Sequence, residues 1–179
     1  MNTRKIIPQV IGQVKQTQYF LRAWYNPPAR PKPHLDWISL SRIIVSLDLE
    51  TTGLDPQRDA ILEIGAIKFR DDEVLDQFST LINPARSIPP KITEITGLRD
   101  ADVVEAPSLF TVLPGLKAFV RDLPIIGHNI AFDLGFLQKQ HLFTDNLAID
   151  TFELAGILIP HAERYGLGAL AREVGIELP

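Results

Sequence analysis

The chain has 179 residues, enough for one domain with a hydrophobic core that needs no disulfide or metal to stabilise it. It has no cysteine, which excludes disulfides, zinc–thiolate sites and thiol nucleophiles. No apolar run approaches the roughly 18 residues of a membrane span, and the start lacks a signal-peptide pattern, so we expect a soluble, cytoplasmic protein with no membrane partner.

Charge and proline content divide the chain near residue 41. Residues 1–42 contain seven basic residues and one acidic residue, whereas residues 43–179 contain eleven basic and 21 acidic residues, a net charge of −10. Four prolines between positions 27 and 33 predict an extended, semi-rigid segment. We therefore expect a basic, Pro-rich arm over residues 1–41 and a folded domain over 42–179. The arm is either a poorly ordered leader or a basic tail that contacts phosphates, and its low serine content disfavours a transit peptide.

The folded domain begins with a predicted buried strand, residues 43–49, that ends in two acidic residues. Asp48 and Glu50 stand at i and i+2, so their side chains point to the same side of the strand. Two like charges this close are unfavourable unless a cation neutralises them. Carboxylate oxygens are the ligands that Mg²⁺ prefers, often together with substrate phosphates. The pattern therefore predicts a divalent-cation site at the end of this strand.

The rest of the domain alternates strands and helices. Further strands are predicted over 61–69, 74–82, 124–127 and 147–149, and Asp71-Asp72 marks the turn of an antiparallel hairpin. Helices are predicted over 109–120, 131–140, 151–159 and 167–174. Pro114 is expected to kink or break the first of them, and Asp150 or Thr151 to cap the third. A hairpin followed by strand–helix units predicts an α/β fold with a mixed sheet and helices on its faces.

A second acidic element spans residues 127–133, where a predicted strand leads into a helix. This junction is the usual place for a site in an open α/β sheet. Asp133 near the helix N-terminus would also be favourable as a simple cap. Alternatively, it is a third carboxylate that converges with Asp48 and Glu50 at one edge of the sheet.

Both acidic elements resemble motifs of a known family. The stretch Asp48-Leu49-Glu50-Thr51-Thr52-Gly53-Leu54 resembles the first motif of the DEDD superfamily of 3′→5′ exonucleases, the group of the DNA polymerase III epsilon proofreading subunit. Residues 128–133 resemble its second motif, and residues 92–98 and 149–155 resemble two further stretches common in that superfamily. The resemblance runs from about Ile43 to the chain end.

The resemblance implies a ribonuclease H-like fold with helices on both faces of the sheet. It also implies hydrolysis of phosphodiester bonds from the 3′ end of a single-stranded nucleic acid, DNA being favoured over RNA. Two divalent cations, Mg²⁺ or Mn²⁺, would act as cofactors. By resemblance, Asp48 bridges both cations, Glu50 holds the one that activates water, and Asp133 supports the other. A DNA polymerase or a fused damage-response helicase is the implied protein partner.

The same motifs imply a set of substrate contacts. The backbone amides of Thr51, Thr52 and Gly53 would approach the terminal nucleotide, since Gly53 has no Cβ to obstruct it. Leu54 and Phe132 would either stack against terminal bases or pack in the core. The remaining expected contacts are His128 and Asn129. Asp150 resembles a helix-capping aspartate of the family and not a metal ligand.

The third motif of the family, His-x-x-x-x-Asp, does not appear in the expected place, after the helix at 167–174. Five positions after His34, His141 and His161 stand residues without a carboxylate, namely Ser39, Asn146 and Gly166. His128 has Asp133 at this spacing, but Asp133 already belongs to the second motif. We therefore expect a domain truncated before its C-terminal helix and impaired in catalysis. The alternatives are a non-catalytic module that binds nucleic acid or docks to a protein, and, less favoured by the motif order, a phosphatase of small molecules.

Overall fold

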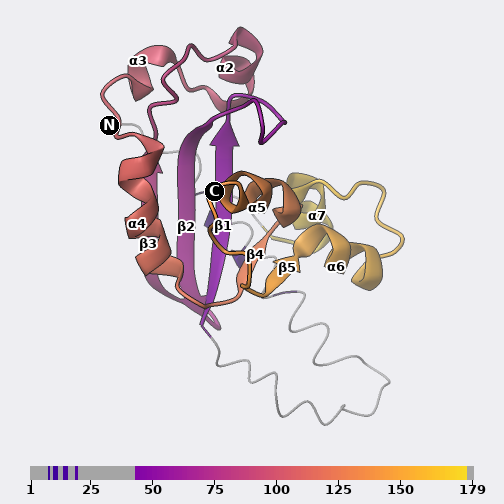
Figure 1. Cartoon of the computed structure of the whole chain (residues 1–179). Helices are drawn as coiled ribbons and strands as arrows, with labels where there is room; N and C mark the ends of the chain where they lie inside the picture. The colour runs from indigo at the N-terminus through magenta and orange to yellow at the C-terminus, as the bar shows by residue number, and fades with distance from the viewer. Residues whose placement is uncertain (1–7, 9, 12–13, 16–18, 20–42, 177–179) are drawn as a thin grey trace.

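In the computed structural model, the described part of the chain is residues 43–176 together with Pro8, Val10, Ile11, Val14, Lys15 and Tyr19. A five-stranded sheet in the order β3-β2-β1-β4-β5 forms its centre (Figure 1). The strands are β1 (Ile44–Thr51), β2 (Ile61–Arg70), β3 (Glu73–Leu81), β4 (Ile125–Gly127) and β5 (Ala148–Asp150). β1 pairs antiparallel with β2 and parallel with β4, so the sheet is mixed, as predicted.

Six helices connect and cover these strands in residues 43–176. They are α2 (Pro90–Thr96), α3 (Asp100–Val103), α4 (Leu109–Val120), α5 (Ile130–Gln138), α6 (Thr151–Leu158) and α7 (Leu167–Glu173). α4 begins at Ser108, whose side chain accepts a hydrogen bond from the Thr111 amide, and it continues through Pro114 to Val120. The break considered at Pro114 is therefore wrong, since the missing proline N–H costs one bond without ending the helix. No helix among the described residues is long and apolar enough to cross a membrane.

Alternate residues of the strands face opposite sides of the sheet and build two cores. Val45, Leu47 and Leu49 pack on one side with Leu116 of α4 and Leu137 of α5. This cluster is the largest core of the domain, and it holds α4 and α5 on that face. Asp48 and Glu50 alternate with these residues along β1, so their side chains belong to the other face.

The opposite face of the sheet is covered from the N-terminal part of the chain. Val10 and Val14 are buried in one cluster with Ile67, Phe69 and Ile126. Both valines are helical and stand one turn apart, so they present the same side to the sheet. Val10 and Val14 therefore pack with the domain, whereas the composition predicted a boundary at residue 41. The remainder of the predicted arm lies outside the described residues.

Candidate active site

The acidic pair lies on the central strand. Asp48 and Glu50 are half-buried near the carboxyl end of β1, and Glu50 is paired directly with Glu63 of β2. Directly opposite residues of an antiparallel pair share one face of the sheet. β1 and β2 together therefore place three carboxylates on one face of the sheet, near the end of β1.

Asp133, a residue of the second motif on α5, contacts the same strand although it is distant in the sequence. Its Oδ1 accepts a hydrogen bond of 2.9 Å from the backbone N–H of Leu49, and the side chain is only 4 % exposed. Burial, followed by the charge of Asp48, raises the pKa of Asp133 well above its usual value. Asp133 is thus not a simple helix cap, because its carboxylate binds the backbone of β1 beside the acidic pair. The second motif therefore contacts the strand that bears the first motif.

Glu63 is a carboxylate that the sequence analysis did not identify. It is 1 % exposed, and its Oε1 is buried without a hydrogen-bond partner. Burial, then the charges of Glu50 and Asp48, raise the pKa of Glu63 to about 7. A single glutamate within the apolar run of β2 could have indicated a functional residue. Its position beside Glu50, however, depends on the register between β1 and β2, which has no local pattern in the sequence.

Glu63 should make the metal-free protein less stable as the pH rises. Between its ordinary pKa of 4.5 and its folded pKa of about 7, the folded protein keeps a proton that the unfolded chain has released. The free energy of unfolding should therefore fall over this interval, by about 1–3 kcal/mol from this group alone. Urea denaturation in EDTA, at a series of pH values, measures it.

In Glu63→Gln the loss of stability with pH should become shallower. The slope should not vanish, because the raised pKa of Asp133 acts in the same direction. Glu94→Gln is the control, since Glu94 is exposed on α2. A Glu63→Gln protein with the wild-type slope would show that Glu63 is ionised in the folded state.

Polar groups of the loop after β1 form hydrogen bonds with one another. Thr51 Oγ1 donates to the carbonyl of Gly53 at 2.6 Å, and the Thr52 N–H donates to the carbonyl of Ala60 at 2.8 Å. The amide of Thr52 is therefore engaged within the chain, which corrects the expectation that it approaches a nucleotide. A Cβ on Gly53 would collide with the carboxylate of Asp59, which would then have to shift. Asp59 Oδ2 in turn accepts from the Asp55 amide at 2.9 Å.

The two apolar candidates for base contacts differ in exposure. Leu54 is 82 % exposed at the tip of this loop, so it is not a core residue. Phe132 is partly buried against the main core, with its ring centroid 5.3 Å from that of Phe136. Leu54 is available to a ligand, whereas Phe132 has a packing role of its own.

The residues of the strand–helix junction contact the end of β5 and the start of α6. His128 Nδ1 lies 3.1 Å from Thr151 Oγ1, and burial lowers the pKa of His128. Asn129 adopts a left-handed conformation, with φ 59°, and its N–H donates to Asp150 Oδ1 at 2.9 Å. Asp150 Oδ1 also accepts from the Phe152 N–H at 2.8 Å and so caps α6, as predicted. The Asn129 side chain is exposed.

The carboxylates near the end of β1 are the type of ligand that a hard cation prefers, but their side chains are not arranged as a metal site. All donors near the end of β1 are oxygens, and the charges of Asp48 and Glu50 raise the pKa values of both Glu63 and Asp133. Within the described ranges, however, no three His, Cys, Asp or Glu side chains are already arranged to hold a metal ion. A cation would therefore have to draw these side chains into place.

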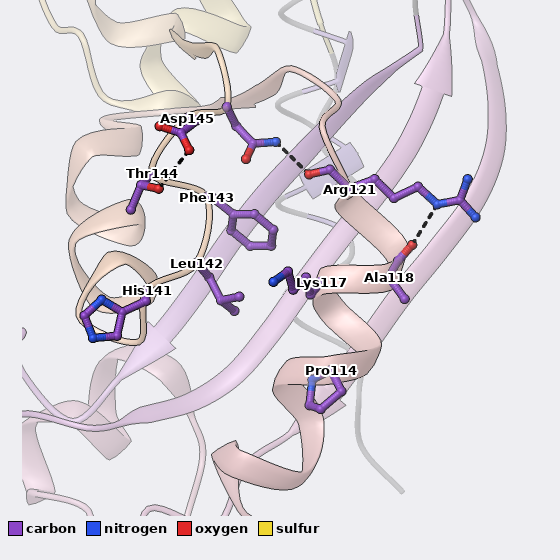
Figure 2. Close-up of a pocket in the computed structure, with 10 residues that line it drawn as sticks. Pro114, Lys117, Ala118, Arg121, His141, Leu142, Phe143, Thr144 and Asp145 are labelled. Atoms are coloured by element: carbon purple, nitrogen blue, oxygen red, sulfur yellow. Dashed lines mark hydrogen bonds between the residues drawn. The ribbon is translucent and has the colours of Figure 1, made fainter.

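A separate pocket of about 570 Å³ lies between α4 and the segment 141–146 (Figure 2). Lys117 and Arg121 line it from the helix, and His141 and Asp145 line it from the segment. None of the residues of either acidic motif lines it. The candidate active site is therefore the carboxylate cluster and not this pocket.

Comparison with known proteins agrees with the fold and the motifs. The RNase_T exonuclease family model matches residues 45–178. The chain is 39 % identical over 138 residues to DNA polymerase III PolC-type of Clostridium perfringens, and 35 % identical over 140 residues to that of Bacillus subtilis. Each match covers 75 % of this chain and 10 % of the relative. The chain thus spans about a tenth of the length of these polymerases, which give no support to the predicted helicase fusion.

Solved structures of exonucleases share the fold. Exonuclease X in complex with duplex DNA carrying a 5′ overhang is 25 % identical, with a TM-score of 0.61 and 75 % of each chain covered. Product-bound exonuclease I superposes with a TM-score of 0.65 at 18 % identity, over 76 % of this chain and 39 % of that one, which supports the fold alone. The ribonuclease H-like mixed sheet predicted from the sequence is confirmed. By its family match and its two acidic motifs, the chain belongs to the RNase_T exonuclease family of the DEDD superfamily.

Proposed function

We propose that residues 42–179 form an exonuclease domain that removes nucleotides from the 3′ end of a single strand. The observation that carries this proposal is the hydrogen bond from the Leu49 amide to Asp133, which brings the second motif to the strand that bears Asp48 and Glu50. Leu49 and Asp133, 84 positions apart in the chain, thus meet at one point of the sheet. That meeting is what a site for phosphodiester hydrolysis requires.

Asp48, Glu50 and Asp133 are the residues that would hold divalent cations, Mg²⁺ or Mn²⁺. Two such cations, when bound, neutralise phosphate charge and supply the attacking water and Lewis-acid stabilisation for an in-line displacement. In this chain, the Leu49 amide donates to Asp133 Oδ1 and so fixes this carboxylate beside β1. Glu63, a buried neighbour of Glu50, adds a further carboxylate to those that the cations would neutralise.

DNA is the substrate favoured by the relatives. The PolC-type relatives are DNA polymerases, and the exonuclease X structure contains DNA. We therefore place the domain with a DNA polymerase partner, in proofreading or repair of a 3′ end. Leu54 and the amide of Gly53 remain our proposed contacts to the terminal nucleotide, with His128 and Asn129 beside them.

A second candidate function is a non-catalytic module that binds a 3′ end without cleaving it. The observation in its favour is that the 179 residues contain no His-x-x-x-x-Asp apart from the His128 and Asp133 of the second motif. In the structure His128 contacts Thr151 while Asp133 contacts β1, so these two residues serve different elements.

Digestion of an end-labelled single strand separates the two functions, and the position of the label reports the direction of digestion. With the third motif appended, the protein should shorten a 5′-labelled single-stranded oligonucleotide stepwise in Mg²⁺, and the same strand labelled at its 3′ end should lose its label at once as a mononucleotide. The chain should be used both as 179 residues and with an appended third motif, because the proposal assigns part of the chemistry to that motif. Binding without any shortening in either protein would favour the non-catalytic module.

A further inference from the structure

Three aromatic rings lie in a row beside the second motif. Phe152 of α6 meets the imidazole of His128 edge-on, with a centroid distance of 5.7 Å, and the ring of Tyr165 at 5.8 Å. Phe152 is 46 % exposed, although its two neighbours are half-buried. Phe152 is therefore an aromatic ring that contacts two other rings and is still open to solvent.

Both neighbouring rings are held in place by hydrogen bonds. His128 Nδ1 lies 3.1 Å from Thr151 Oγ1, which in turn donates to the carbonyl of Gly127. The hydroxyl of Tyr165 donates to the carbonyl of Ile159 at 3.0 Å. The Phe152 ring is therefore set in its orientation before any ligand binds, which lowers the entropic cost of a contact.

The sheet register places this row next to the carboxylates. β1 pairs with β4 at Ser46 and Ile126. Asp48 and His128, each two residues further on, therefore lie at the same level along the strand direction. β4 pairs with β5 at Gly127 and Asp150, which puts the start of α6 one strand further. Neighbouring strands lie about 4.8 Å apart, so the backbone at the end of β5, where α6 begins, lies about 10 Å from the backbone of β1 along this edge of the sheet. A short single strand whose end lies at Asp48 can reach the start of α6.

We infer that Phe152 is a stacking platform for one base near the 3′ end of the single-stranded substrate. The inference rests on the proposed function, because it places the scissile end of the strand at Asp48 and Glu50. Stacking on an aromatic ring accepts any base, since every base has a π-face, and it suits a nuclease without sequence preference. In this assignment Tyr165 and His128 are positioning residues for the Phe152 ring.

The test is binding of a fluorescent single-stranded oligonucleotide to the 179-residue protein in EDTA, where no hydrolysis occurs. Phe152→Ala should weaken binding roughly 5- to 150-fold, the range that loss of one base–aromatic stack produces. Phe152→Leu, which keeps an apolar contact to Tyr165 without a π-face, should also bind weakly, and Phe152→Trp should bind like wild type. Phe110→Ala is the matched control, because Phe110 is 85 % exposed on α4 outside this row.

Two readouts separate stacking from a structural role. The salt dependence of binding should keep its slope in Phe152→Ala, because no phosphate contact is lost. An oligonucleotide with one abasic position, moved stepwise from the 3′ end, should bind wild type more weakly at one position and show no further loss there in Phe152→Ala. Equal binding by wild type, Phe152→Ala and Phe152→Leu would overturn the inference while leaving the exonuclease proposal intact. Failure of wild type to bind any single strand both in EDTA and in Mg²⁺ would overturn the proposed function itself.

Discussion

Appending a helix that carries His-x-x-x-x-Asp to the 179-residue chain should raise the rate of mononucleotide release by roughly 10²–10⁴-fold, the contribution of a placed general base. The chain contains three of the four acidic residues that its resemblance to the DEDD superfamily implies, Asp48, Glu50 and Asp133. The missing histidine would take the proton of the attacking water, and its partner aspartate would complete the ligands of the cations. We therefore expect the 179-residue chain to release little or no mononucleotide in Mg²⁺.

The appended helix has to reach the face of the sheet to which Asp48 and Glu50 belong. The other end of that face is already covered by Val10 and Val14, so the helix must fit beside them. The matched control is the same fusion with its histidine and aspartate replaced by alanine, which adds equal apolar cover without chemistry. Rapid digestion by the 179-residue chain, abolished by Asp48→Ala, would show that a residue already present supplies the base.

Gly127→Ala should lower the free energy of unfolding by about 1–3 kcal/mol, the usual cost of an extra carbon in a filled core. A Cβ at this position would lie 2.5 Å from Ile130 Cδ1 and 2.9 Å from the carbonyl oxygen of Leu47. The tip of Ile130 has some freedom to move, but the Leu47 carbonyl belongs to the central strand. The collision would push β4 and the start of α5 away from β1, and with them Asp133.

Gly156→Ala is the opposite case and the control for Gly127. Gly156 lies inside α6, and a Cβ there would meet no atom within 4 Å. Alanine should therefore stabilise the protein by about 0.5–1 kcal/mol through its better helix propensity. Urea denaturation of both variants should give changes of opposite sign. A Gly127→Ala protein as stable as wild type would mean that β1 and β4 are less closely packed than described.

The sheet was predictable from the sequence because its strands have clear local signals. Asp71-Asp72 marks the hairpin turn, and β2 and β3 pair on either side of it as expected. The sequence analysis predicted neither α2 nor α3, because the adjacent prolines Pro89-Pro90 suggest an interruption of regular structure. Pro90 is instead the first residue of α2, where a missing N–H costs nothing, and Gly97 ends the helix with φ 74°.

The candidate site was predictable only in part. Asp48, Glu50 and Asp133 belong to motifs, whereas Glu63 joins them through its pairing with Glu50, which depends on how the loop between β1 and β2 closes. In that loop Asp59 accepts a hydrogen bond from the amide of Asp55 and lies against Gly53, which has no Cβ. Such long-range geometry has no local pattern in the sequence.

Titration of Mn²⁺ into the metal-free protein tests the central claim most directly, namely that Asp48 and Asp133 share one cation site. Asp48→Asn and Asp133→Asn should each weaken Mn²⁺ binding by at least the roughly 10- to 100-fold that loss of an outer-shell partner costs. Asp122→Asn, which removes the same charge from an exposed turn, should bind Mn²⁺ like wild type. Equal Mn²⁺ affinity in wild type, Asp48→Asn and Asp133→Asn would contradict the assignment of the active site.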